Sequence, residues 1–75
     1  MKITGTSSYI KVEFDNKIVK IQGEMMVNGF LAYSDTIKNW EPPFEHIIID
    51  KVTKTKLIKA IIDETKDSKF KIEFE

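Results

Sequence analysis

The spacing of apolar residues changes twice along this chain, and these changes constrain its fold more than any other feature. Over Tyr9–Phe14 apolar and charged residues alternate, which puts the apolar side chains on one face of a strand. From Lys51 to about Thr65 the apolar residues instead recur at helical spacing. The residues that carry this spacing are Leu57, Ile58, Ile61 and Ile62. Residues 69–75 alternate again, so the pattern predicts strands, then a single helix, then a last strand.

Two dipeptides predict the turns between the first strands. Asp15-Asn16 follows the alternating segment, and both of its residues tolerate a positive φ angle. Asn28-Gly29 is the dipeptide most typical of a type I′ hairpin turn. Gly23 lies between two strand-like runs, where a glycine often marks a bend. We therefore expect an antiparallel meander in which both hairpins share one long, bent strand.

The remaining segments are predicted to complete a sheet whose apolar face must be buried by a second layer. Residues 36–40 and 47–49 are predicted to be short extended pieces, and Asp50 or Thr53 is predicted to be the N-cap of the helix. Apolar strand faces would stay exposed without a second layer, so we expect the helix to cover them. The predicted fold is a single α+β domain over residues 1–75. It is an antiparallel β-meander of five to six strands with one helix packed on the sheet and the C-terminal strand after the helix.

The composition excludes several classes of chemistry. The chain has no cysteine, which rules out disulfides, a thiol nucleophile and thiolate metal sites. His46 is the only histidine, and the sequence contains no catalytic, metal-binding or nucleotide-binding motif. We therefore expect a protein that is not an enzyme and that has no catalytic residue, no metal and no cofactor.

The charge and hydropathy of the chain restrict the class of binding partner and the cellular location that we expect. The 12 basic residues are all lysine, and they balance 12 acidic residues. Nucleic-acid binders usually carry a positive surplus and use arginine for bidentate contacts, so nucleic acid is disfavoured as a partner. Apolar runs such as residues 47–49 are far too short for a membrane span, and the first residues lack the apolar run of a signal peptide. We expect a soluble, cytoplasmic protein without a membrane partner.

The run Trp40-Glu41-Pro42-Pro43-Phe44 is the sharpest motif in the chain. Each proline fixes φ and biases the residue before it away from helix, so we expect Glu41 and Pro42 to be extended. A stiff elbow of this kind holds two large aromatic side chains at fixed positions. In one interpretation, Trp40 and Phe44 fill the core or the sheet edge. In the other they anchor a partner, because aromatic residues dominate interface hot spots.

The predicted helix carries its charges in an unusual order. Lys51, Lys54 and Lys56 crowd its first turns. Asp63 and Glu64 fall near its end. This order opposes the helix dipole, which favours acidic residues first and basic residues last. One interpretation is a solvated lysine surface, and the other is a surface that meets an acidic partner.

Met25 and Met26 are adjacent in a predicted strand. Neighbouring side chains in a strand point to opposite faces of the sheet. We therefore expect one methionine in the core and the other exposed or facing a partner.

Several of these features together resemble a known family. They are Gly23-Glu24 after a hairpin, Phe30 in an apolar stretch, the Ile-x-x-Trp-Glu-Pro-Pro run of residues 37–43, the helix, and the alternating last strand. In this combination, over roughly residues 8–75, the chain resembles small immunity proteins of bacterial polymorphic toxin systems. The resemblance implies a non-enzymatic, cytoplasmic antidote that binds the toxin domain encoded beside it. The positions that match the family are Gly23, Glu24, Trp40, Glu41, Pro42 and Pro43.

The leading hypothesis is therefore an immunity protein that neutralises one cognate toxin domain by occlusion. The predicted partner contacts are Trp40, Glu41, Phe44 and Glu24. The residues assigned to the fold are Gly23, Pro42 and Pro43. Two alternatives stay open: a small β-rich scaffold or self-associating domain without a toxin, and a weak binder of single-stranded nucleic acid through Trp40 and Tyr33. The activity of the toxin, the face that binds it and the oligomeric state are left open.

Overall fold

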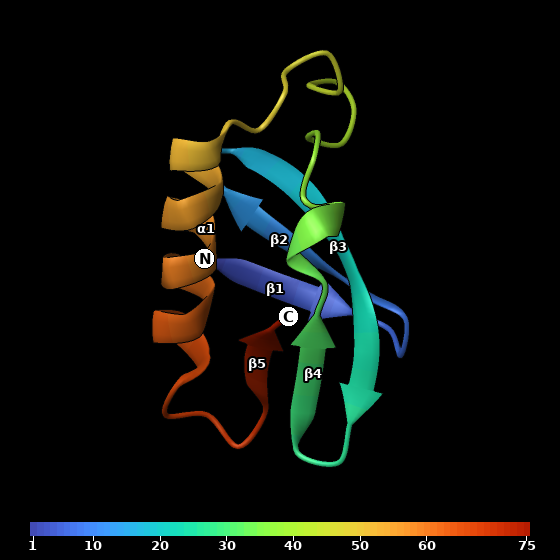
Figure 1. Cartoon of the computed structure of the whole chain (residues 1–75), viewed down its shortest axis with the longest axis vertical. Helices are drawn as coiled ribbons and strands as arrows, with labels where there is room; N and C mark the ends of the chain where they lie inside the picture. Colours follow the sequence, from blue (N-terminus) through green and yellow to red (C-terminus); the bar gives the residue numbers. More distant parts are fainter.

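The computed structural model describes residues 1–75 as a five-stranded sheet with one α-helix (Figure 1). In chain order the elements are β1 (Lys2–Gly5), β2 (Tyr9–Phe14), β3 (Lys17–Met26), β4 (Gly29–Ala32), the 3-10 helix η1 (Ser34–Thr36), α1 (Lys51–Thr65) and β5 (Lys71–Phe74). The strands lie in the sheet in the order β1-β2-β3-β4-β5. The predicted α+β class, with one helix and the last strand after it, is confirmed.

The last pair of strands departs from the predicted antiparallel meander. β1 to β4 form antiparallel pairs, whereas β5 runs parallel to β4, with Phe30 opposite Ile72. α1 lies between these two strands in the chain and carries it back along the sheet, so β5 starts from the same end as β4. A crossover of this kind joins parallel strands, whereas a short hairpin joins antiparallel ones. The sheet is therefore mixed and mostly antiparallel.

β3 belongs to two halves of the sheet. Its residues 17–22 pair with β2, and its residues 23–26 pair with β4. The change of partner falls at Gly23, along the curve of β3 in Figure 1. A Cβ atom on Gly23 would overlap the carbonyl oxygen of Leu31 and the ring of Phe30, so only glycine fits this close approach. The prediction of one long strand shared by both hairpins is confirmed.

The first hairpin turn is the predicted one. Asp15 and Asn16 have φ angles of 54° and 62°, and Phe14 pairs with Lys17 across them. Positive φ at both central residues is what a type I′ turn requires, and its twist matches that of the flanking strands. Local chemistry therefore determines this end of the β2–β3 hairpin.

The second hairpin forms, but its turn lies one residue earlier than predicted. Met26 pairs with Gly29, which leaves Val27 and Asn28 as the turn residues. Neither Asn28 nor Gly29 has a positive φ, so the turn is not of type I′. A Cβ atom on Gly29 would overlap the carbonyl oxygen of Lys71 in β5. The glycine therefore serves the close contact between β4 and β5 rather than the turn.

The segments 36–40 and 47–49, which are predicted to be short extended pieces, meet in one isolated antiparallel bridge between Asn39 and Ile48, but neither becomes a strand of the sheet. The chain first turns through η1, where the Thr36 hydroxyl donates to the Tyr33 carbonyl oxygen at 2.7 Å. A local bond from a threonine side chain to the backbone competes with strand pairing. The region after β4 is therefore a turn and a loop instead of a further strand.

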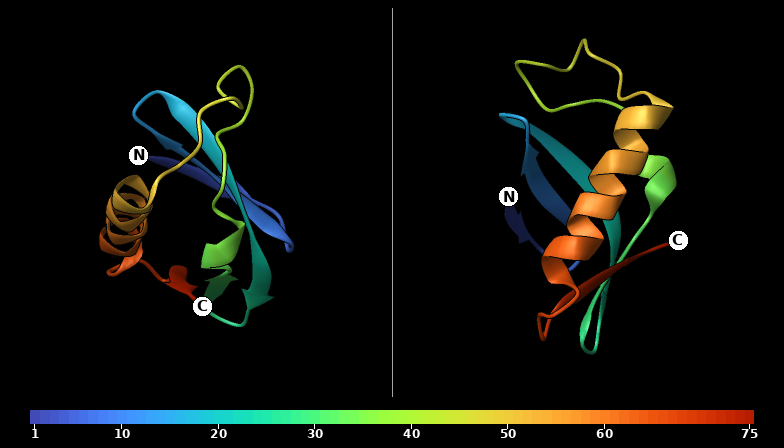
Figure 2. Two further views of the ribbon diagram at one scale, coloured as in Figure 1. Left: turned by 45° about the horizontal axis from the view of Figure 1, so that its top comes forward. Right: turned by 90° about the vertical axis from the view of Figure 1, so that its left-hand side faces the viewer.

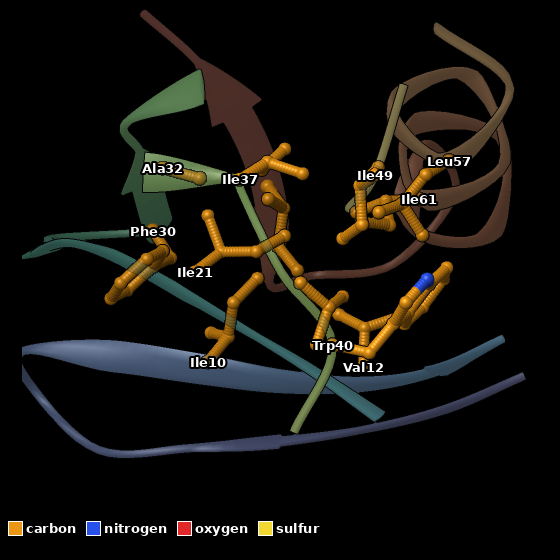
Figure 3. Packing of buried hydrophobic residues seen from close by; sticks show 12 residues of the cluster. Ile10, Val12, Ile21, Phe30, Ala32, Ile37, Trp40, Ile49, Leu57 and Ile61 are labelled. Carbon is orange, nitrogen blue, oxygen red and sulfur yellow. The ribbon is translucent and has the colours of Figure 1, made fainter. Parts of the chain in front are cut away.

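Twelve buried apolar side chains form one core between the sheet and α1 (Figure 3). They are Ile10, Val12, Val19, Ile21, Phe30, Ala32, Ile37, Trp40, Ile49, Leu57, Ile61 and Ile72. α1 contributes Leu57 and Ile61, one turn apart on the same face. On the same face Thr65 is buried, and its hydroxyl donates to the Ile61 carbonyl oxygen at 3.0 Å and accepts from the Ile72 amide at 3.3 Å. The helix therefore packs on the sheet as predicted and is tied directly to β5.

The molecule measures 35 × 21 × 20 Å, and its long axis is vertical in Figure 1. The loop between η1 and α1 lies at one end of this axis, and the β3–β4 turn lies at the other. Figure 2 shows α1 lying along one side of the curved sheet. Neither helical segment has the length and apolar character that a bilayer-spanning helix requires.

Candidate functional site

Residues 40–47 form a loop at one end of the molecule, between η1 and α1 (Figure 1). This segment is named the aromatic loop here, because it contains Trp40 and Phe44. Its base is closed by the Ile49 amide, which donates to the Lys38 carbonyl oxygen at 2.8 Å. The loop is therefore a closed projection that starts and ends next to the core.

The two prolines lie in a turn and not in an extended elbow. The Phe44 amide donates to the Glu41 carbonyl oxygen at 3.0 Å, and the Pro42–Pro43 peptide bond is cis. The chain has to reverse here because residues on both sides of the loop are buried in the same core. The segment is therefore a turn and not the stiff extended elbow that the sequence predicts.

Trp40 supports the aromatic loop from inside the molecule. It is 5% exposed and belongs to the core, on the side of Val12 in β2 (Figure 3). The Lys17 ammonium lies 5.7 Å from the centroid of the Trp40 ring and 5.5 Å from that of the Phe44 ring, within the range of cation–π attraction. Phe44 is half-buried against the core. It is therefore the more exposed of the two aromatic side chains of the loop.

Glu41 connects the loop to the first half of the sheet through a backbone hydrogen bond and a side-chain ion pair. Its amide donates to the Ile18 carbonyl oxygen of β3 at 2.7 Å. Its carboxylate lies 3.8 Å from the Lys11 ammonium, and the two side chains are 34% and 44% exposed. A pair this exposed adds little stability, so the carboxylate keeps most of its capacity to meet a partner.

Glu24 lies apart from the other predicted contact residues. It is exposed in the second half of β3, six positions beyond Ile18, which corresponds to roughly 20 Å along a strand. Its side-chain hydrogen bond is the main cause that raises the pKa of Tyr33 above the ordinary value of 10.0. Desolvation and the negative charges of Glu24 and Glu75 act in the same direction. The structure therefore brings Trp40, Glu41 and Phe44 together, but not Glu24.

α1 begins directly after the aromatic loop. Of the two predicted N-cap candidates, Asp50 and Thr53, it is Asp50 that caps the helix, and its carboxylate accepts the Thr53 amide at 2.7 Å. This hydrogen bond is the largest cause that lowers the pKa of Asp50 below its ordinary value of 3.8, and the charge of Lys56 adds to it. The cap therefore holds the helix start at a defined place beside the loop.

Two exposed apolar side chains extend the surface beside this cap. Ile48 is 75% exposed and Val52 is 64% exposed. Of the isoleucine run at residues 47–49, which is predicted to be a buried strand, only Ile49 is buried. Because three identical residues in a row do not show which of them faces the core, the sequence did not reveal the exposed apolar pair Ile48 and Val52.

A second candidate surface lies in the other half of the molecule, between β1 and the end of α1. It is an apolar groove with a volume of about 350 Å³. Its apolar lining consists of Met1, Ile3, Ile10, Met25, Phe70 and Ile72. No sequence motif marks these residues, because they come from four different parts of the chain.

Met25 shows why the groove exists. It pairs with the buried Phe30 and so lies on the core face of the sheet, yet it is 47% exposed. α1 ends at Thr65, beside the groove, and leaves Met25 uncovered. Met26, on the opposite face, is 50% exposed. The expectation that one of the two methionines lies in the core is therefore wrong.

Both surfaces offer apolar contact area bordered by charged groups. No three His, Cys, Asp or Glu side chains lie close enough together to hold a metal ion. His46 is exposed in the aromatic loop. An apolar centre with a polar border is the usual anatomy of a surface that binds another protein.

Residues 2–75 match the protein family described as Immunity protein 74. The resemblance to immunity proteins is thereby confirmed over almost the whole chain, although the match does not single out the Trp-Glu-Pro-Pro run. No curated protein and no solved structure matches the chain significantly.

Proposed function

The chain belongs to the Immunity protein 74 family, and from this premise we propose that it binds one cognate bacterial toxin domain and neutralises it by occlusion, without catalysis. Membership of the family suggests a toxin-neutralising role and a toxin protein as the partner. The geometry of the aromatic loop is the observation that supports a particular binding surface. There, Phe44 is half-buried and packs against the core to which Trp40 belongs, and Lys17 lies near both rings.

The aromatic loop suits tight binding because it is already ordered in the free chain. The closing bond at Ile49, the turn at Glu41 and the bond from Glu41 to β3 all restrict its backbone. A segment that is ordered before binding loses little conformational entropy when the partner arrives. An aromatic side chain on such a segment is a typical interface anchor.

The predicted contact residues enter this proposal with different roles. Phe44 and Glu41 contact the toxin directly. Trp40 acts through the support that it gives to Phe44. Glu24 takes part only if the interface extends about 20 Å along β3 from the loop.

The expected size of the interface shows that the loop cannot form it alone. A standard interface buries about 800 Å² on each partner, which is roughly 15% of the 5184 Å² surface of this chain. One short loop does not supply this area. The toxin must therefore also cover surface next to the loop, which is bordered by the β2–β3 hairpin and by the first half of α1.

Calorimetric titration of the purified protein against the toxin domain encoded beside its gene tests the proposal. We expect one-to-one binding with an affinity in the nanomolar range or tighter, together with loss of toxicity. No binding between the two folded proteins would reject the function itself.

Phe44→Ala tests the surface, and Phe74→Ala is the matched control, because both rings are half-buried and pack against the core from different regions. Phe44→Ala should weaken binding by about 2 kcal/mol, or about 30-fold, as removal of an interface anchor does. Phe74→Ala should leave the affinity within about threefold. Thermal unfolding of both variants monitors their folding. Equal loss of affinity in the two variants would move the binding surface away from the loop.

Self-association is the second candidate function, and the free edge of β1 favours it. β1 is the first strand of the sheet, and it borders the apolar groove. An exposed edge of this kind can pair with a second copy of the chain. Light scattering at high protein concentration should reveal a dimer if this is the main role, and a strict monomer would reject it.

A further inference from the structure

We infer that the first half of α1 is part of the toxin-binding surface and that it takes an acidic protein surface with an apolar centre. This inference rests on the function proposed above and names the chemistry of the partner. The residues concerned, called the lysine face here, are the exposed lysines Lys51, Lys56 and Lys59. The exposed side chains of Ile48 and Val52 lie beside them.

The lysine face carries positive charge that the chain itself does not balance. No acidic residue occurs between Asp50 and Asp63, although the whole chain has a net charge of zero. The only ion pair of the chain joins Lys11 to Glu41, so no lysine of α1 has a carboxylate within 4.0 Å. The positive charge is thus concentrated on one half of one helix.

Asp50, the acidic residue that directly precedes the helix, already serves as the helix cap. Its carboxylate accepts the Thr53 amide at 2.7 Å and caps the helix. In the first two turns, Lys51 and Lys56 therefore have only this engaged carboxylate nearby in the sequence. Their positive charge is available to a group outside the chain.

The charge order of α1 also works against the helix. Positive charges in the first turn meet the positive end of the helix dipole and cost about 0.3–1 kcal/mol each when they lie at the very end. α1 has no acidic residue in its first turn and no basic residue in its last. Asp50 at the N-cap and Lys66 at the C-cap offset part of this cost, but the lysines of the first two turns still oppose the dipole. A charge order that works against the helix in this way is a signal of a functional surface.

The apolar side chains set this surface apart from a site for nucleic acid. A shallow depression of about 410 Å³ is lined by Lys51, Val52, Thr55 and Lys56. Lysine stems add apolar area around Val52 while their ammonium groups stay in water. Phosphate backbones are preferentially met by arginine, which this chain lacks, and they gain nothing from an apolar centre. An acidic protein surface with an apolar side chain at its middle fits both features.

The charge-reversal pair Lys51→Glu and Lys56→Glu tests the inference. The control pair is Lys2→Glu and Lys71→Glu, which changes the net charge equally at two exposed lysines outside α1. Affinity for the toxin domain is measured by calorimetry at low and at moderate salt. Like charges placed against each other across an interface are strongly unfavourable, so the first pair should weaken binding at least about tenfold. It should also flatten the salt dependence, whereas the control pair should change the affinity less than about threefold.

Equal losses in the two pairs would overturn the inference while leaving the proposed function intact. A second probe covers the case in which the toxin domain does not bind at all. A short peptide of alternating glutamate and leucine, and a thymidine oligonucleotide of similar charge, are titrated into the isotope-labelled protein and followed by NMR. Peptide-induced shifts confined to residues 48–59, and lost in the Lys51→Glu/Lys56→Glu variant, would support an acidic protein partner even if the proposed function fails. Absence of such shifts, or tighter binding of the oligonucleotide at this face, would overturn it.

Discussion

The two halves of the molecule use their apolar side chains in opposite ways. In the aromatic loop, Trp40 is 5% exposed and belongs to the core. In the apolar groove, Met25 is 47% exposed and Phe70 is 42% exposed. The side chain best suited by type to be an interface anchor is therefore buried, whereas common residue types line the open groove. The comparison teaches that exposure, rather than residue type, decides which aromatic or aliphatic side chains can meet a partner.

The reach of α1 explains this difference. A helix of 15 residues is about 22 Å long, which is shorter than the 35 Å long axis of the molecule. At the loop end, the helix start and the loop together cover the core face of the sheet. At the other end, α1 stops at Thr65 and nothing continues over Met25.

The largest predicted effect belongs to the loop end. Trp40→Ala should lower the free energy of unfolding by about 3–5 kcal/mol, because it removes a large buried side chain and leaves a cavity. Urea unfolding followed by circular dichroism measures this change. Trp40→Phe, which keeps most of the apolar contact, should cost clearly less. A loss below about 1 kcal/mol for Trp40→Ala would show that Trp40 is not part of the core and would break the comparison.

An intermediate effect is expected at the helix cap beside the loop. The pKa of Asp50 is lowered in the folded state, so its contribution to stability is present above its ordinary pKa of 3.8 and is lost as the pH falls through the lower folded-state pKa. Asp50→Asn keeps a capping side chain but removes this titration. The melting temperature of the wild type should exceed that of the variant at pH 7, and this gap should close as the pH falls below the ordinary pKa of 3.8 and through the lower folded-state pKa. A gap that stays constant with pH would contradict the role assigned to the carboxylate.

The smallest effect is expected in the groove. Met25→Ser and Phe70→Ser should change the free energy of unfolding by about 0.5 kcal/mol or less, as most surface substitutions do, because both side chains are already exposed. If the loop end binds the toxin, the affinity measured by calorimetry should also stay unchanged. A loss of about 30-fold or more would place the toxin on the groove and reverse the assignment of the two surfaces.

Local patterns in the sequence were sufficient for much of the fold. The alternation of Tyr9–Phe14, the helical spacing of Lys51–Thr65 and the turn at Asp15-Asn16 all reappear in the structure. Each depends on contacts between near neighbours in the chain, which periodicity and turn chemistry reflect directly. For the same reason the sequence grouped Trp40, Glu41 and Phe44, which lie within one short loop.

Contacts between distant segments account for the errors. Gly29 looked like a turn residue, but the backbone of β5 approaches it too closely for any side chain. The isoleucine run at residues 47–49 looked like a buried strand, but only Ile49 is fully buried, whereas Ile47 packs partly against the core and Ile48 is exposed. Glu24 matched the family pattern, but the length of β3 places it far from the loop.

The sequence by itself determined the class of fold, the single helix with its cap, and the membership of an immunity protein family. It did so because strand alternation, helical spacing and capping are properties of neighbouring residues. Only the tertiary structure decided that β5 pairs in parallel with β4, that Trp40 lies in the core while Phe44 meets solvent, and that Met25 stays uncovered. These features depend on how far α1 extends over a curved sheet, and that is set by the packing of the whole chain.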